Sequence, residues 1–255
     1  FDGAMSHANV YINGQKVGYW PYGYNSFHFD ITKYLKPGEK NTLAVRLENL
    51  PESSRWYPGA GLYRNVHLIV TEDAYIPVWG TYITTPSVNE KFAKVNVLTK
   101  VVLPEGADPA KYSVETSVWN PNKQKLTAVR TSLAQMKYNN DQAEQEFVIQ
   151  DPSLWSPEMP ALYSAETRLY EGDKLKDVYT TPFGIRSIEI IPDKGFFLNG
   201  KRTVFKGVCN HHDLGPLGAA VNDAAIRRQI RILKDMGCNA IRTSHNMPAP
   251  ELIRA

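Results

Sequence analysis

The chain has 255 residues, 42% of them hydrophobic and 22% charged, which are the proportions of an ordinary globular protein. Its formal net charge is only +3 and it has no block of lysine and arginine, so nucleic acid is not expected as a partner. No apolar run approaches the roughly 20 residues of a membrane-spanning helix, so no membrane partner is expected. The length suggests about two domains, with one or three as alternatives.

Residues 1–73 are expected to form β-structure. Alternating runs over 9–12 and 15–19 flank Asn13-Gly14, and Asn-Gly in that setting favours a tight hairpin. Further strands are expected over 26–31, 42–47 and 65–70. We interpret this region as an incomplete β-sandwich, because about 70 residues are few for a whole one.

Residues 74–183 are also expected to be β-structure. Seven strands are predicted, over 78–85, 94–103, 112–119, 127–133, 143–149, 163–170 and 176–181. Turn signals separate these strands at the spacing of a sandwich, which favours an immunoglobulin-like module. The proline-rich segment 151–163 is expected along a sheet edge, because proline cannot donate to a central ladder.

The pattern changes at about residue 184. After a predicted hairpin at Asn199-Gly200, the apolar run 204–209 is typical of a strand buried on both faces. Asn222 then caps a predicted amphipathic helix that ends at Gly237, and a further strand is expected over 239–242. Strand, helix and strand in this order imply a parallel sheet. A second helix is expected to begin within 248–252.

The two cysteines and the aromatic loops carry no motif of their own. Cys209 and Cys238 have neither metal-binding nor redox spacing and lie among apolar residues, so we expect two small core residues. No metal ion or cofactor is therefore expected. Aromatic residues gather in the segments YWPYGYNSF and WYPGAGLY. They would either stack on sugars or pack junctions between domains, and we favour packing for Trp56 and Tyr57.

Five segments of the chain, in order, resemble family 2 glycoside hydrolases. They are RWYPGAGLYRNVHL (55–68), DPSLWSPEMPALY (151–163), FGIRSIE (183–189), FFLNGKRTVFKGVCNHHDLGPLGAAV (196–221) and IRTSHNMP (241–248). The segment HHDLGPLG is most similar to the β-galactosidase branch. The resemblance implies a mainly β multidomain fold. In it, 1–73 would be the C-terminal part of a jelly-roll sugar-binding domain, 74–183 an immunoglobulin-like β-sandwich, and 184–255 the start of a (β/α)8 TIM barrel.

The resemblance also implies where catalysis occurs. Retaining glycosidases use two carboxyl groups about 5–5.5 Å apart, one as nucleophile and one as acid/base. In the family these are glutamates on later barrel strands. Residues 184–255 contain two glutamates. Glu189 precedes the predicted hairpin, and Glu251 falls in the first turn of a predicted helix. We therefore assign no catalytic residue in this chain, and expect it to be a fragment with the catalytic pair downstream.

Part of a sugar pocket is expected within the chain. TIM-barrel active sites lie at the C-terminal ends of the strands, so residues that follow the first two strands would share one rim. By motif position, His211 and His245 match family histidines that hydrogen-bond the galactosyl ring. Asp213 and Arg242 are further substrate-binding candidates, with Arg242 expected to orient a later carboxylate.

Structural roles are the alternative for these residues. The histidines could instead pin the loops after the strands, and for His212 and Asp213 the two interpretations are balanced. A metal site over 210–213 is not favoured, because alternate side chains would point to opposite faces. Arg55 lies in a loop that reaches the active site in family members, but the match is inexact, so we favour packing or an ion pair.

The predicted function is hydrolysis of terminal β-galactosides by a retaining mechanism, with a carbohydrate as substrate. β-Glucuronidase and β-mannosidase share the scaffold and stay open as alternatives. A non-catalytic carbohydrate-binding β-sandwich module is a different class, and the βαβ unit argues against it. Association of like chains through the β domains is left open. So is the compartment, with a periplasmic or extracellular one slightly favoured over the cytoplasm.

Overall fold

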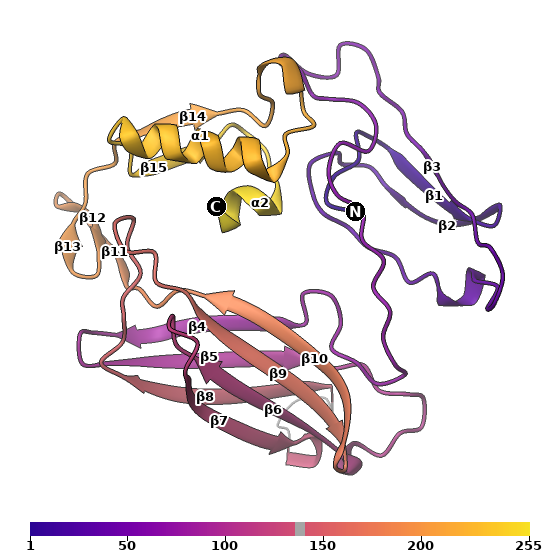
Figure 1. Ribbon diagram of the computed structural model, residues 1–255, viewed down its shortest axis with the longest axis horizontal. Coiled ribbons are helices and arrows are strands. Elements are labelled where there is room, and N and C mark those ends of the chain that lie inside the picture. Colours follow the sequence, from indigo (N-terminus) through magenta and orange to yellow (C-terminus); the bar gives the residue numbers. More distant parts are fainter. Residues whose placement is uncertain (136–140) are drawn as a thin grey trace. The chain divides into compact units, whose positions relative to one another are not determined.

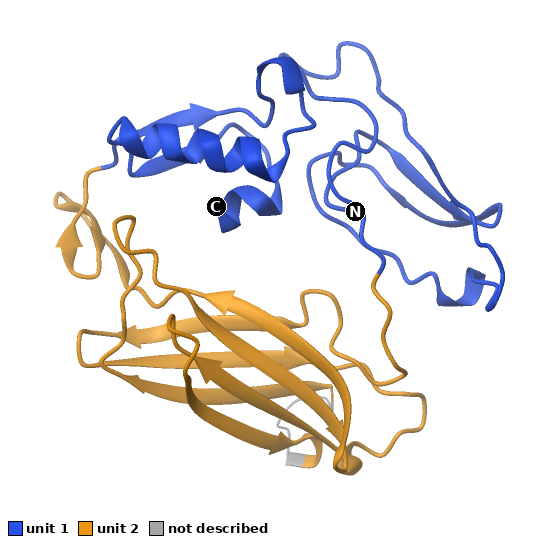
Figure 2. Ribbon diagram, in the orientation of Figure 1, with its two compact units in different colours: residues 1–68, 205–255 blue, residues 69–204 orange. Residues whose placement is uncertain are grey.

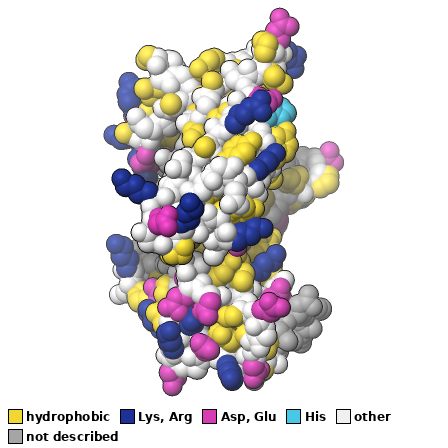
Figure 3. Space-filling model, turned by 90° about the vertical axis from the view of Figure 1, so that its right-hand side faces the viewer, with side chains coloured by type: hydrophobic (Ala, Val, Ile, Leu, Met, Phe, Trp, Pro, Cys, Tyr) yellow, Lys and Arg dark blue, Asp and Glu magenta, His cyan; other side chains and the backbone are white. Residues whose placement is uncertain are grey.

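The computed structural model describes residues 1–135 and 141–255 (Figure 1). The chain forms two compact units, one made of Phe1–Leu68 with Phe205–Ala255 and the other of Ile69–Val204 (Figure 2). On the face drawn in Figure 3, side chains of both charges are scattered among apolar ones. No helix built from the described residues has the length and apolarity needed to cross a membrane.

Three strands of the first unit form an antiparallel sheet in the order β2-β1-β3. They are β1 (Ala8–Ile12), β2 (Gln15–Trp20) and β3 (Leu43–Arg46), and the 3-10 helix η1 (Thr32–Tyr34) precedes β3. The predicted hairpin is confirmed: Asn13 and Gly14 have φ angles of 51° and 80°, and the tight turn needs both to be positive. Val10 of β1 packs with Phe27 in the core of this region.

Two of the strand predictions for residues 1–73 are wrong. The range 26–31 forms no strand, although Phe27 and Phe1 exchange two backbone hydrogen bonds of 2.9 and 3.0 Å. The range 65–70 also forms none, and Leu68 and Val70 are 74% and 84% exposed. A strand requires a continuous ladder with a neighbour. Among the described residues, each range meets only isolated partners.

Two antiparallel sheets form the larger part of the second unit (Figure 1), and all seven strands predicted for 74–183 are confirmed. One sheet has the order β4-β5-β8, with β4 (Thr81–Val88), β5 (Phe92–Lys100) and β8 (Gln142–Gln150). The other has the order β10-β9-β6-β7, with β6 (Tyr112–Trp119), β7 (Lys125–Ser132), β9 (Tyr163–Glu171) and β10 (Lys174–Phe183). The 3-10 helices are η2 (Pro109–Lys111) and η3 (Leu133–Gln135).

The core of the second unit lies between these sheets. Val95 and Val97 of β5 are fully buried, as are Val114 and Val118 of β6. Gln145 of β8 is also buried, and its Nε2 donates to the carbonyl oxygens of β6 and β7.

The proline-rich segment 151–163 forms no edge strand. It is irregular until Tyr163, where β9 begins, because its prolines remove ladder donors. A three-stranded sheet follows, in the order β11-β12-β13. Its strands are β11 (Ile188–Ile191), β12 (Gly195–Leu198) and β13 (Lys201–Arg202). The hairpin at Asn199-Gly200 is thus confirmed, whereas β11, which contains Glu189, was not predicted.

The predicted strand, helix and strand are confirmed. They are β14 (Gly207–Asn210), α1 (Asp223–Asp235) and β15 (Ala240–Thr243), with η4 (Gly215–Leu217) before α1 and α2 (Pro250–Arg254) after β15. β14 and β15 pair in parallel. Asn222 Oδ1 accepts from Ala225 N at 2.9 Å, and Gly237 has a φ of 87° just after the helix. Both expected helix boundaries are therefore correct.

The burial expected around β14 is wrong. Val204 and Phe205 are 58% and 61% exposed, and they precede the strand. Cys209 is exposed and Cys238 is half-buried, so neither is a core residue. The reason is that β14 has β15 as its one strand neighbour among the described residues, so the other edge of β14 is not covered by a strand.

Candidate functional site

His211 and His245 lie side by side at the C-terminal ends of the two parallel strands β14 and β15. His211 directly follows β14, and Ser244 N, just before His245, donates to Asn210 O at 2.8 Å, which extends the pairing beyond β15. The two imidazole centroids are 5.8 Å apart, with an angle of 76° between the rings. Both side chains are exposed, so they are accessible from solvent.

Trp56 lies against both imidazoles. Its ring centroid is 5.5 Å from that of His211 and 5.9 Å from that of His245. Its Nε1 donates to the hydroxyl oxygen of Tyr24 at 3.2 Å, which fixes the indole. An imidazole can donate and accept a hydrogen bond, while an indole face offers apolar contact area. The three rings therefore combine the two kinds of contact that a sugar ring requires.

His212 has different surroundings from its neighbour His211. Its Nε2 lies 3.0 Å from Pro58 O. The centroid of its ring is 4.9 Å from that of Tyr24 and 6.1 Å from that of Tyr63. Because a carbonyl only accepts, this nitrogen carries the proton. Burial lowers the pKa of His212, which favours the neutral ring. These contacts support the structural interpretation of His212.

Arg242 and Asp213 do not join the ring cluster. Arg242 lies within β15, opposite Cys209 of β14, and its Nη1 donates to Cys209 Sγ at 3.8 Å. This bond is the main cause that lowers the pKa of the Cys209 thiol. The half-buried carboxylate of Asp213 is close enough to raise the pKa of His212 slightly against the effect of burial. The sequence interpretation thus grouped four residues of which the structure brings two together.

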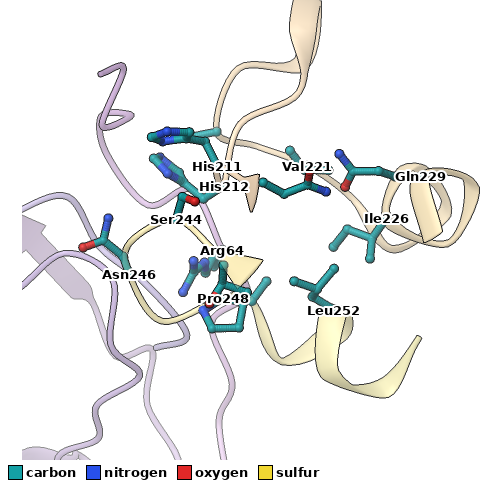
Figure 4. A pocket seen from close by; sticks show the side chains of 14 residues that line it. Arg64, His211, His212, Val221, Ile226, Gln229, Ser244, Asn246, Pro248 and Leu252 are labelled. Carbon is teal, nitrogen blue, oxygen red and sulfur yellow. The ribbon is translucent and has the colours of Figure 1, made fainter. Parts of the chain in front are cut away.

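A small pocket is lined in part by His211 and His212 (Figure 4). Its volume of about 50 Å³ admits a few water molecules rather than a sugar ring. Its walls include Arg64, Asn210, His212, Ile226 and Leu252. The buried atoms Asn210 Nδ2 and His212 Nδ1 have no hydrogen-bond partner among the described residues, so they are positioned to bind such water.

Sequence reasoning missed the residues that hold the loop after β15. Arg64 Nη2 donates to Met247 O at 2.9 Å, and the Tyr22 hydroxyl donates to Asn246 Oδ1 at 2.5 Å. Tyr22 lies in the aromatic-rich segment YWPYGYNSF that the sequence interpretation noted, and Arg64 directly follows the segment WYPGAGLY. No local pattern shows that these segments meet the loop.

Glu251 and Arg55 were also considered as site residues. Glu251 Oε1 accepts from Asn65 Nδ2 at 3.0 Å and from Arg254 Nη2 at 2.9 Å, which suits a helix-start residue. Arg55 is exposed. Across residues 1–135 and 141–255, no group of three histidine, cysteine or acidic side chains is arranged to hold a metal ion.

Three family models match the chain in succession. Residues 1–72 match the sugar-binding domain of glycosyl hydrolases family 2. Residues 75–186 match the model described as glycosyl hydrolases family 2, and residues 189–254 match the TIM barrel domain of the same family.

Individual relatives include enzymes named for two sugars. The β-galactosidase BoGH2A of Bacteroides ovatus is 45% identical over 254 residues, which are 99% of this chain and 30% of that protein. A putative β-glucuronidase of Formosa agariphila is 40% identical over 252 residues, 98% of this chain and 23% of that protein.

Solved structures are similar over the whole chain. A glycosyl hydrolase family 2 member from Bacteroides cellulosilyticus has a TM-score of 0.92 and 36% identity, covering 100% of this chain and 33% of that one. A Bacteroides uniformis β-glucuronidase has a TM-score of 0.85 and 30% identity, covering 99% and 32%. The chain thus spans about a third or less of the length of these four relatives.

Proposed function

Because the chain belongs to glycosyl hydrolase family 2, we propose that its full-length protein hydrolyses terminal β-galactosides with retention of configuration. The observation that carries this proposal is the cluster of His211, His245 and Trp56 at the ends of adjacent parallel strands. Ligand sites of TIM barrels lie at that end of the strands.

The chemistry assigned to the cluster is hydrogen bonding to sugar hydroxyls. An imidazole in its neutral form offers one donor and one acceptor, and two rings with centroids 5.8 Å apart can hold different hydroxyls of one sugar. Trp56 would contact the apolar face of the ring. These contacts orient the sugar and strengthen as it flattens towards an oxocarbenium-like transition state.

Bond cleavage is assigned to two glutamates in the barrel sequence beyond residue 255. One would act as nucleophile and the other as acid/base. We propose that Arg242 orients one of these carboxylates and that Asp213 takes part in substrate binding. Hydrogen bonding to Glu251 by Asn65 and Arg254 supports leaving that carboxylate out of the catalytic pair.

The domain division is part of the proposal. We place the jelly-roll part at 1–73, the immunoglobulin-like sandwich at 74–183 and the start of the barrel at 184–255. The ranges matched by the three family models support boundaries near these positions. The compact units group the two outer ranges together. This grouping fits a sugar-binding domain that contributes to the site on the barrel rim.

β-Glucuronidase is the second candidate, because a putative β-glucuronidase is almost as similar to this chain as the β-galactosidase is, at 40% against 45% identity. The two activities are separated by comparing kcat/KM of the full-length protein for aryl β-galactoside, β-glucuronide and β-mannoside. We expect kcat/KM to be highest for the galactoside, because the relative with the higher of these two identities is named a β-galactosidase. A preference for the glucuronide or mannoside would overturn the galactoside assignment. Absence of turnover on all three would favour a binding module.

A further inference from the structure

Arg64 joins three separate segments of the chain through backbone oxygens. Its Nη1 donates to Tyr24 O at 2.7 Å and to Asp2 O at 3.2 Å. Its Nη2 donates to Met247 O at 2.9 Å. All three acceptors are backbone carbonyls rather than carboxylates. The Arg64 side chain therefore links the backbones of these three segments. The planar guanidinium makes the link possible, because its two terminal nitrogens face different segments at once.

The segment held by Arg64 is the loop that carries His245. Met247 is two residues after His245, and Asn246 between them accepts a hydrogen bond from the Tyr22 hydroxyl at 2.5 Å. The Met247 side chain is 61% exposed, so its burial does little to anchor the loop. Asn65 adds a bond from its Nδ2 to Glu251 Oε1 further along. Hydrogen bonds from residues 22, 64 and 65 therefore fix the connection between β15 and α2.

We propose that Arg64 and Tyr22 are positioning residues, which hold His245 against His211 and Trp56 in the arrangement that binds the sugar. This inference rests on the proposed function. His245 is exposed and follows the end of β15, so the position of its ring depends on the loop that continues from it. A displacement of about 1 Å in a group that contacts substrate can cost up to about 100-fold in rate.

The test uses the full-length protein with Arg64→Lys and Tyr22→Phe. Lysine keeps the charge but cannot donate to three carbonyls in a planar fork. Phenylalanine removes only a hydroxyl from a ring that is 43% exposed, so this variant is expected to fold. We expect kcat/KM for the preferred aryl β-glycoside to fall about 10-fold with Arg64→Lys and about 3-fold with Tyr22→Phe. The loss should lie mainly in kcat. The matched control is Arg46→Lys, which changes an exposed arginine paired with Glu48, and it should leave kcat/KM unchanged.

Combination with His245→Phe separates positioning from general destabilisation. If Arg64 and Tyr22 act through His245, adding either variant to His245→Phe should cause no further loss of kcat/KM. Losses that multiply, or normal turnover of both single variants, would overturn the positioning role while leaving the function of His245 intact. Normal turnover of His245→Phe itself would instead contradict the proposed function. If Arg64→Lys does not fold, Tyr22→Phe alone decides between these outcomes.

Discussion

Neighbouring histidines can differ in role because their surroundings differ. His211 is exposed beside Trp56, whereas His212 packs against Tyr24 and Tyr63 and hydrogen-bonds to Pro58 O. A sequence motif can place both after the same strand. It cannot say which ring is buried, because burial depends on residues about 150 positions earlier in the chain, as in the His212–Pro58 bond with a separation of 154.

The burial of His212 predicts a pH dependence of local stability. Burial lowers its pKa below the ordinary value of 6.5, so the unfolded chain binds more protons as the pH falls below 6.5. The stabilising contribution is therefore complete above pH 6.5 and is lost as the pH falls towards the folded-state pKa. Hydrogen exchange of amides in β14 and β15 at several pH values measures it. His212→Gln should show a flatter dependence than the parent protein. Equal slopes for the two proteins would contradict this account.

Arg64 shows the limit of reading a site from sequence. The resemblance already covered Arg64 within the segment 55–68. Its bond to Met247 O nevertheless spans 183 positions, and no periodicity or motif connects such distant residues. Candidates that touch a sugar can be predicted by motif. Residues that position those candidates can be identified only from the folded structure, because their contacts are distant in sequence.

Strand prediction succeeded where both sheets of a sandwich are present. In β8 the residues alternate between buried and exposed, and the sequence follows the same period of two except at the buried Gln145 and the exposed Val148. The ranges 26–31 and 65–70 alternate as well but form no strand. Alternation of apolar and polar residues indicates which face of a segment is apolar. A strand forms only if a neighbouring segment is available for backbone hydrogen bonding.

Gln145 provides a test of how the sheet β4-β5-β8 is joined to the sheet β10-β9-β6-β7. Its buried Nε2 donates to Val114 O at 3.1 Å, Val129 O at 2.9 Å and Thr131 Oγ1 at 3.1 Å. Gln145→Leu keeps the approximate volume and removes these bonds, so we expect a loss of about 1–3 kcal/mol in the free energy of unfolding. Urea unfolding of residues 69–204 measures the change.

The matched control lies in the same strand. Gln150→Leu changes an exposed glutamine of β8, so it should alter the free energy of unfolding by no more than about 0.5 kcal/mol. If both leucine variants unfold at the same urea concentration, Gln145 does not join the sheets energetically.

The cap of α1 can be tested in the same way at the level of one helix. Asn222 Oδ1 accepts from Ala225 N, so Asn222→Ala leaves that amide without its partner. We expect the first turn of α1 to lose about 1 kcal/mol of protection, measured by hydrogen exchange. Arg231→Ala on the exposed face of the helix should change protection little, since alanine is a good helix former. Unchanged exchange in Asn222→Ala would show that the cap is not stabilising.

At the scale of the whole molecule, the mainly β multidomain character and the start of a barrel were predictable. Turn spacing predicted the seven strands of the second unit, and the βαβ pattern predicted the parallel pair. The association of Phe1–Leu68 with Phe205–Ala255 into one compact unit was not predictable from local patterns. It depends on contacts such as those of Trp56 with the two histidines, which join segments far apart in sequence.

The central claim is that His211 and His245 bind the sugar. The most direct test measures kcat/KM and thermal unfolding of full-length His211→Phe and His245→Phe, with exposed His28→Phe as control. A charge-assisted hydrogen bond, such as one to the sugar as it gains charge in the transition state, is worth about 1.5–3 kcal/mol, which corresponds to roughly 10- to 100-fold in rate. We therefore expect kcat/KM to fall by that factor in both variants at a nearly unchanged melting temperature, and to stay normal in the control. Near-normal kcat/KM with a markedly lower melting temperature would contradict the claim and make both histidines structural.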